Sequence, residues 1–180
     1  MGDGRRAADP GWRMWTAIKA FFLRLFGRLG KTPASEAPAS ERRLANRLLS
    51  YWEGKRRGRT FPALADIREG EIAELWPWCF VLDVKESQSF PYFQYLGREL
   101  GRYSGVFLSG ERDWTLTLLD KATAGFAEVL KRRAPVLIES EIVRYDKKKL
   151  LFRTVLLPLS DDQANIDYVL GAANGKLVDQ

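Results

Sequence analysis

The sequence contains no histidine and a single cysteine, Cys79, among its 180 residues. Histidine is the usual ligand of haem iron and zinc and the commonest acid–base residue, so its absence excludes histidine-ligated cofactors and a Ser–His–Asp triad. One cysteine excludes an internal disulfide and any all-cysteine metal site, which is typical of a reducing compartment. Because Cys79 lies at the apolar start of an expected strand, we interpret it as a buried small hydrophobe.

Charge is distributed unevenly along the chain. Residues 1–59 carry 14 basic and 5 acidic side chains, net +9, whereas the remaining 121 carry 15 and 18, net −3. The basic character therefore belongs to an N-terminal arm, and we expect no nucleic-acid groove on the globular part. Hydrophobic residues make up 46% of the chain, which suits one well-buried domain with extensions.

The arm contains a strongly amphipathic segment. Residues 1–10 are rich in Gly, Asp and Arg and are expected to be disordered, and residues 11–30 predict a helix with an aromatic face and a basic face. Apolar side chains on one face and cations on the other are typical of a helix lying on an anionic membrane surface. The candidate membrane-binding residues are Trp12, Arg13, Trp15, Ile18, Lys19, Phe22, Arg24, Leu25, Phe26, Arg28 and Leu29.

Other interpretations of this helix remain open. Four basic residues interrupt it, which disfavours a membrane-spanning helix, and Arg24 and Arg28 break the apolar core that a secretory signal needs. The helix could instead pack on its own domain or on a partner. Residues 31–40, a linker rich in Pro, Ala and Ser, would allow the helix to act at a distance from the core.

A second helix is predicted over residues 41–58, leading into the domain. Ser40 is its expected cap, and a basic loop ends it. Leu44, Leu48, Tyr51 and Trp52 form one apolar stripe at i, i+4, i+7 and i+8. The stripe either docks on the domain or provides a contact for a second copy or a protein partner.

Alternation and turn residues predict an α+β domain over residues 59–175. A short helix is expected over 66–75, opened by a capping box at Asp66 and Glu69, and a longer one over 116–133. Strands are expected over 79–84, 90–96, 135–145, 149–159 and 166–173, the last three forming an antiparallel meander with a polar turn at 160–165.

No set of residues in the domain demands catalysis. Asp161 and Asp162 fall in the expected turn, and Glu139 and Glu141 share a solvated strand face. The glycines spaced by four from Gly97 lack the Lys-Ser/Thr of a phosphate-binding loop. We therefore expect a protein that is not an enzyme and binds no metal.

Several local patterns, in this order and spacing, resemble the PAS-like family of short alphaproteobacterial proteins often called PAS_5. They are Leu49-Ser-Tyr-Trp52, Pro62 with Asp66-Ile67, Leu75-Trp-Pro77, Phe93-Gln-Tyr-Leu-Gly97, Gly101-Arg-Tyr-Ser-Gly105 and Leu157-Pro-Leu-Ser160. The resemblance covers about residues 44–173 and implies a five-stranded antiparallel sheet with helices on one face. The family usually has charged residues at two positions where this chain has Gln94 and Tyr103.

The resemblance implies a regulatory or sensory module, in a family linked to motility and cell-cycle control. PAS domains generally hold a ligand or a partner between the sheet and its helices. Two hypotheses follow. The first is a non-catalytic regulator without a cofactor, peripheral to the cytoplasmic side of the bacterial inner membrane, acting through a protein partner or a homodimer. The second is a sensor with an unidentified small molecule in its core.

Overall fold

The computed structural model describes residues 39–88, 91–104, 118–143 and 149–178, which lie in one compact unit. Its elements, in chain order, are helix α2 (Ala39–Arg56), the 3-10 turns η1 (Leu64–Asp66), η2 (Glu69–Glu71) and η3 (Trp76–Trp78), strands β1 (Cys79–Asp83) and β2 (Tyr92–Leu96), helices α3 (Arg98–Tyr103), α4 (Leu118–Thr123) and α5 (Phe126–Arg132), and strands β3 (Val136–Val143), β4 (Lys149–Leu159) and β5 (Tyr168–Val178). The helix predicted over residues 41–58 is thus present as α2.

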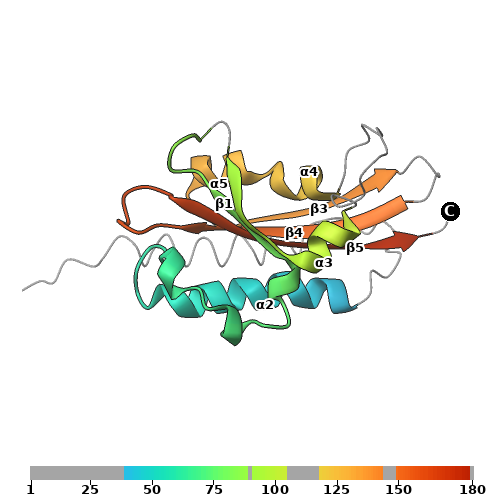
Figure 1. Cartoon of the computed structure of the whole chain (residues 1–180), viewed down its shortest axis with the longest axis horizontal. Coiled ribbons are helices and arrows are strands. Elements are labelled where there is room, and N and C mark those ends of the chain that lie inside the picture. The colour runs from blue at the N-terminus through green and yellow to red at the C-terminus, as the bar shows by residue number, and fades with distance from the viewer. Residues whose placement is uncertain (1–38, 89–90, 105–117, 144–148, 179–180) are drawn as a thin grey trace, which may run out of the picture. The chain divides into compact units, whose positions relative to one another are not determined.

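The five strands form one antiparallel sheet in the order β2-β1-β5-β4-β3 (Figure 1). The predicted meander is confirmed, because β3 pairs with β4 and β4 pairs with β5 along the chain. The last strand then lies beside β1, so the final hairpin joins both halves of the sheet.

The hairpin β4–β5 is long because apolar residues recur through both strands and a polar loop closes it. Its register runs from Lys149 opposite Val178 to Leu159 opposite Tyr168. In the loop, the Asp162 carboxylate accepts hydrogen bonds from the backbone N–H groups of Ala164 and Asn165, at 2.8 and 2.7 Å. Hydrogen bonds from Asn165, and weaker contributions from the Ala164 N–H and the Ser160 hydroxyl, hold the pKa of Asp162 well below its usual range.

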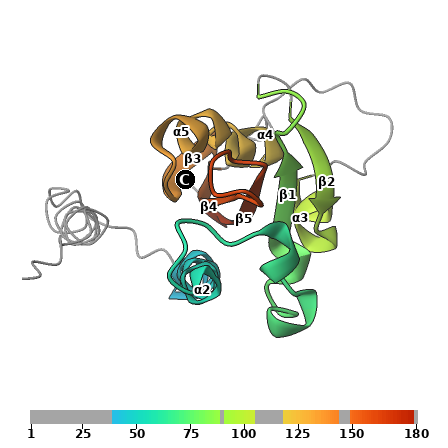
Figure 2. The ribbon, with the colours of Figure 1, turned by 90° about the vertical axis from the view of Figure 1, so that its left-hand side faces the viewer.

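Apolar side chains fill both faces of the sheet. On one face, residues of β1, β4 and β5 pack with α3, α4 and α5, and Phe80, Leu100 and Leu156 are fully buried there. On the other, α2 and the segment from Phe61 to Leu75 cover β1, β4 and β5. Figure 2 shows the sheet between α2 and the pair α4 and α5. The predicted sheet with helices is confirmed, and α2 adds a helical layer on the second face.

The prediction of one continuous helix over residues 116–133 is wrong, because the described part of that range contains a break. Within the described part of that range, α4 ends at Thr123 and α5 begins at Phe126, with Gly125 between them. A Cβ at Gly125 would lie 2.5 Å from Ile138 Cδ1 and 2.7 Å from Leu156 Cδ1, so the backbone approaches the sheet too closely for a side chain. Glycine is also a poor helix former, so the chain turns at this contact.

The short helix expected over residues 66–75 is replaced by 3-10 turns. Asp66 does not cap a following helix: its carboxylate accepts a hydrogen bond from the N–H of Ala63 at 2.8 Å and pairs with Arg59 at 2.5 Å. Ile67 is extended, and Gly70 lies in the next turn. Asp66 therefore stabilises the 3-10 turn η1 that it ends, and no α-helix begins at this residue.

Candidate docking groove beside helix α2

The apolar stripe of α2 docks the helix on its own sheet. Leu44, Leu48 and Trp52 are 8%, 0% and 3% exposed and pack with Leu157, Leu170 and their neighbours. The Trp52 indole Nε1–H donates a 2.8 Å hydrogen bond to the Pro158 carbonyl of β4. Their spacing of four residues brings these side chains to one face of the helix.

Burial of the stripe favours the interpretation that it docks on its own domain. Because Leu44, Leu48 and Trp52 contact the domain itself, they are not exposed to a second copy in this structure. In this structure these residues dock α2 on the sheet, and self-association through the stripe stays a prediction. Tyr51, the fourth stripe residue, is half-buried and lines an open groove instead.

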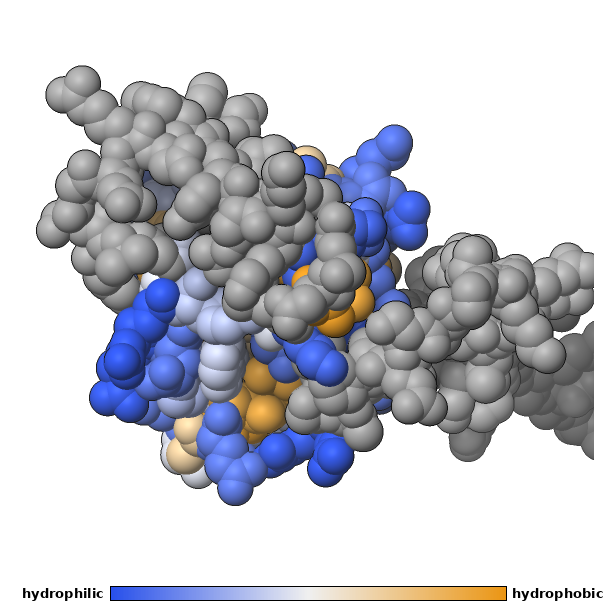
Figure 3. All heavy atoms as spheres, turned by 90° about the vertical axis from the view of Figure 1, so that its right-hand side faces the viewer, coloured by the Kyte–Doolittle hydropathy of each residue, from blue (hydrophilic) through white to orange (hydrophobic). Residues whose placement is uncertain are grey.

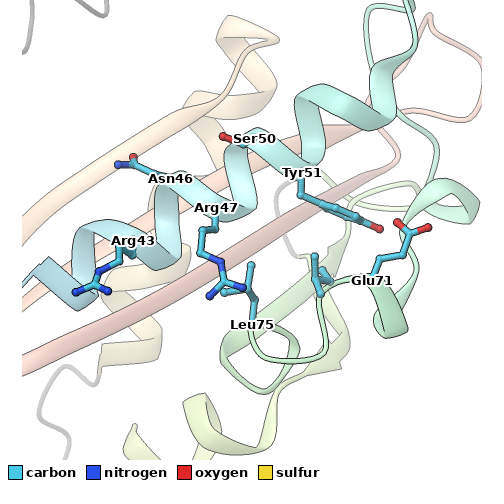
Figure 4. Close-up of a pocket in the computed structure, with 8 residues that line it drawn as sticks. Arg43, Asn46, Arg47, Ser50, Tyr51, Glu71 and Leu75 are labelled. Atoms are coloured by element: carbon cyan, nitrogen blue, oxygen red, sulfur yellow. The ribbon is translucent and has the colours of Figure 1, made fainter.

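The groove has a volume of about 410 Å³ and lies between α2 and the segment that contains η2 (Figure 4). It is lined by Arg43, Asn46, Arg47, Ser50, Tyr51, Glu71, Ile72 and Leu75. The helix contributes the polar wall, and the nearly buried Ile72 and Leu75 form the apolar floor. In Figure 4, Arg43 and Arg47 extend from the same side of α2, and Tyr51 extends toward Glu71.

Ion pairs connect the two walls. Lys55 pairs with Glu71, and the Lys55 ammonium lies 5.2 Å from the centre of the Tyr51 ring. The Lys55 hydrogen bond lowers the pKa of Glu71, and burial raises the pKa of the Tyr51 hydroxyl. Arg47 pairs with Glu74 at 2.8 Å, although both side chains are largely exposed. The groove is thus cationic along α2 and has a paired carboxylate at its far end.

Local contacts also hold the turns that form the far wall. The N–H of Arg68 donates to the Tyr51 hydroxyl at 2.8 Å, which fixes the chain just before η2 against α2. The groove residues on α2 share one side of the helix, a pattern visible in the sequence. Their opposite wall comes from residues 71–75, and the sequence contained no signal for that approach.

The opposite face of the sheet is covered by α3, α4 and α5. There, the Phe80 ring lies directly on Gly171, where a Cβ would be only 2.2 Å from Phe80 Cζ. Phe80 also contacts the Phe93 ring edge to face at 6.1 Å between centroids. Aromatic and aliphatic side chains of this chain therefore occupy the described centre of that face.

Cys79 is fully buried and its thiol donates to the Leu75 carbonyl at 3.3 Å. Burial raises the pKa of this thiol to about 12, so it is protonated at neutral pH and is a poor nucleophile. In the described ranges, no three acidic or cysteine side chains come together in a way that could hold a metal ion.

The candidate membrane-binding residues between Trp12 and Leu29 lie outside the described residues. No helix in the described part of the chain is both long and apolar enough to cross a membrane. Figure 3 shows one end of the molecule, where hydrophilic residues predominate among the coloured atoms and hydrophobic ones form small separate areas.

A family model described as PAS domain, PAS_5, matches residues 41–174, and the five-stranded sheet with its helices agrees with that match. The chain belongs to the PAS_5 family. The match includes all but the first two residues of α2 and ends within β5, so the groove and both faces of the sheet belong to the PAS domain. PAS domains are in general sensory or signalling modules without catalytic activity.

Solved structures that are similar to this PAS domain include light-oxygen-voltage (LOV) domains. The dark structure of the blue-light photoreceptor Aureochrome1 LOV shares 12% identity, with a TM-score of 0.40 over 63% of this chain and 85% of that one. The LOV domain of the blue-light activated histidine kinase EL346 from Erythrobacter litoralis shares 17%, with a TM-score of 0.37 over 56% and 95%. The comparison with curated proteins gives no match.

Proposed function

We propose that this PAS_5 protein is a non-catalytic regulator, attached peripherally to the cytoplasmic face of the bacterial inner membrane by residues 12–29, that acts by binding a protein partner. Motility, polarity or cell-cycle control are the outputs that suit such a module. The observation that carries the proposal is that side chains of the chain itself fill the described centre of both faces of the sheet. Recognition then takes place at the surface, where the groove beside α2 is open.

Two chemical observations support a role without catalysis. Cys79 is buried and protonated, so it lacks the thiolate that a nucleophile requires. The Asp162 carboxylate accepts hydrogen bonds from its own loop, which gives it a structural task. Neither group is placed to exchange protons with a substrate.

One observation favours the second candidate, a PAS sensor with a small molecule in its core. The Ser104 hydroxyl, at the end of α3, is buried and has no hydrogen-bond partner among the residues that the structure describes. A buried hydroxyl without a partner is unfavourable, and a bound polar group would satisfy it. This hydroxyl is close in sequence to Leu100, which packs on the same face as Phe80.

Native mass spectrometry of the purified full-length protein separates the two candidates. The proposed function predicts the mass of the polypeptide, alone or as an oligomer, without an added small molecule. A reproducible extra mass that is lost on unfolding would support the sensor instead. A Ser104→Ala variant should then retain less of that molecule, and with no ligand its mass should differ from wild type only by the lost oxygen atom.

Membrane attachment is tested by co-sedimentation with vesicles. Burying an aromatic side chain contributes on the order of 1.5–3 kcal/mol, less at an interface, and each basic residue adds about 1 kcal/mol near an anionic leaflet. Wild type should sediment with phosphatidylglycerol vesicles, bind phosphatidylcholine more weakly and be partly released by salt. Phe22→Glu, in the middle of the apolar face, should remain in the supernatant. If this variant sediments like wild type, the apolar face is not the contact.

A further inference from the structure

The exposed flank of α2 presents a row of hydrogen-bond donors. Arg43, Asn46, Arg47 and Ser50 are all exposed and lie within one arc of the helix, because their positions differ by three or four residues. The two guanidinium groups stay charged at any physiological pH, and the amide and hydroxyl can also donate. Such a row matches the oxygen atoms of a phosphate group.

Glu71 lines the groove, and Glu74 pairs with Arg47, another lining residue, so both carboxylates already have cationic partners. Glu71 is held by Lys55 at the far end. Glu74 pairs with Arg47, with 78% and 54% of the two side chains exposed, and such exposed pairs contribute little to stability. An incoming anion can therefore replace Glu74 on Arg47 at small cost, while the pair at Glu71 stays in place.

The distance along the chain keeps this flank near any surface that the arm binds. Nine residues lie between Leu29 and the first residue of α2, Ala39, so the ten Cα–Cα steps of this connection span at most about 35 Å. A tether of this length gives the second contact a high effective concentration once the first has formed. Weak individual contacts at Arg43 and Arg47 are then sufficient to hold this flank on the membrane surface.

We propose that the groove-bearing flank of α2 is the side of the PAS domain that faces the membrane, with the phosphate of an anionic phospholipid bound between Arg43 and Arg47. The proposal rests on the proposed attachment through residues 12–29. It adds an orientation: the groove faces the bilayer, and α4 and α5, on the opposite side of the sheet, face away from it.

A fluorescent label on the full-length protein tests this orientation. Ser50→Cys is labelled with an environment-sensitive dye, and Cys79 does not compete because it is buried. Phosphatidylglycerol vesicles should shift the emission to the blue, whereas phosphatidylcholine vesicles should give a much smaller change. The matched control is Ala127→Cys, exposed on α5, whose emission should stay constant. A silent label at Ser50 on protein that sediments would overturn the orientation and leave the attachment standing.

Inorganic phosphate distinguishes a lipid from a soluble ligand. If millimolar phosphate alone produced the Ser50 shift and abolished the response to vesicles, the groove would be a site for a soluble anion, contrary to the proposal. If wild type does not sediment at all, the attachment itself fails, and that result is independent of the label.

Charge variants give a second, quantitative test. Arg43→Gln with Arg47→Gln should weaken binding to phosphatidylglycerol vesicles about 10- to 30-fold at low salt. Each cation near an anionic surface contributes about 1 kcal/mol, so the effects of losing two multiply. The control removes two charges from α5, with Lys131→Gln and Arg132→Gln, and should weaken binding less than threefold. Equal losses in the two variants would mean that net charge alone decides, and the assigned face would be wrong.

Discussion

Replacing Trp52 by phenylalanine tests whether α2 is an integral layer of the PAS domain. The Trp52 side chain is 3% exposed, lies against β4 and β5, and donates a 2.8 Å hydrogen bond to the Pro158 carbonyl. Phenylalanine keeps an aromatic ring at this position but removes the donor and shortens the side chain. The change therefore acts on one bond and one contact of the helix.

The expected loss follows from these two contributions. A buried carbonyl that loses its donor costs about 1–3 kcal/mol. The space left by the smaller ring adds about 1 kcal/mol. We expect the free energy of unfolding to fall by about 2–4 kcal/mol, which lowers Tm by roughly 5–15 °C in a domain of this size.

Urea unfolding followed by far-UV circular dichroism measures this loss, and light scattering gives the mass of the variant. Ser50→Ala is the control, because Ser50 is exposed on the other side of the same helix and its removal should change stability by less than about 0.5 kcal/mol. A Trp52→Phe protein as stable as wild type would refute the docking described for α2. A halved mass with unchanged stability would show that Trp52 contacts a second copy instead.

Three further predictions follow from the described contacts. Gly171→Ala should lower the free energy of unfolding in urea by about 1–3 kcal/mol, because the new Cβ would overlap the Phe80 ring. Adding Phe80→Leu should restore part of the loss, and a single variant as stable as wild type would contradict this packing. Cys79 should not react with a thiol reagent at pH 8 until the protein is unfolded, since its raised pKa keeps the thiol neutral in the folded state, and folding should become less favourable above the unfolded thiol's pKa. Deleting residues 1–39 should leave a soluble protein that melts cooperatively, because all five strands and the helices that cover them follow in the chain, and an unfolded product would place the arm in the core.

The sheet could be predicted from the sequence because its strands carry strong local signals. The polar residues around Asp162 lie between two apolar runs, and the observed loop and register agree with that pattern. The break between α4 and α5 could not be predicted with equal ease. Gly125 alone is compatible with a continuous helix, and only its approach to Ile138 and Leu156 explains the turn.

The groove illustrates a second limit of the sequence. Arg43 and Arg47 are visible as an exposed row on a predicted helix, but the other wall depends on how Tyr51 and Arg68 bring the 3-10 turns against α2. The stripe at Leu48 and Trp52 was equally clear, yet periodicity cannot distinguish docking on the same chain from docking on another. In both cases the sequence does not show which surface packs against the side chains of α2.

The two functional hypotheses differ in which face of the sheet receives the signal: a bound small molecule would act on one face, and membrane attachment would act on the other. A ligand near Ser104 would act on α3 and its neighbours, which pack on the face that includes Phe80. Attachment through residues 12–29 would act on α2, the helix that follows them in the chain and packs on the other face. β5 lies at the centre of the sheet, and Leu170 on one face alternates with Val169 on the other, so this strand contacts both helical layers. Strand β5 is therefore the element that both hypotheses share, because its side chains pack in the two helical layers on which the ligand or the attachment would act.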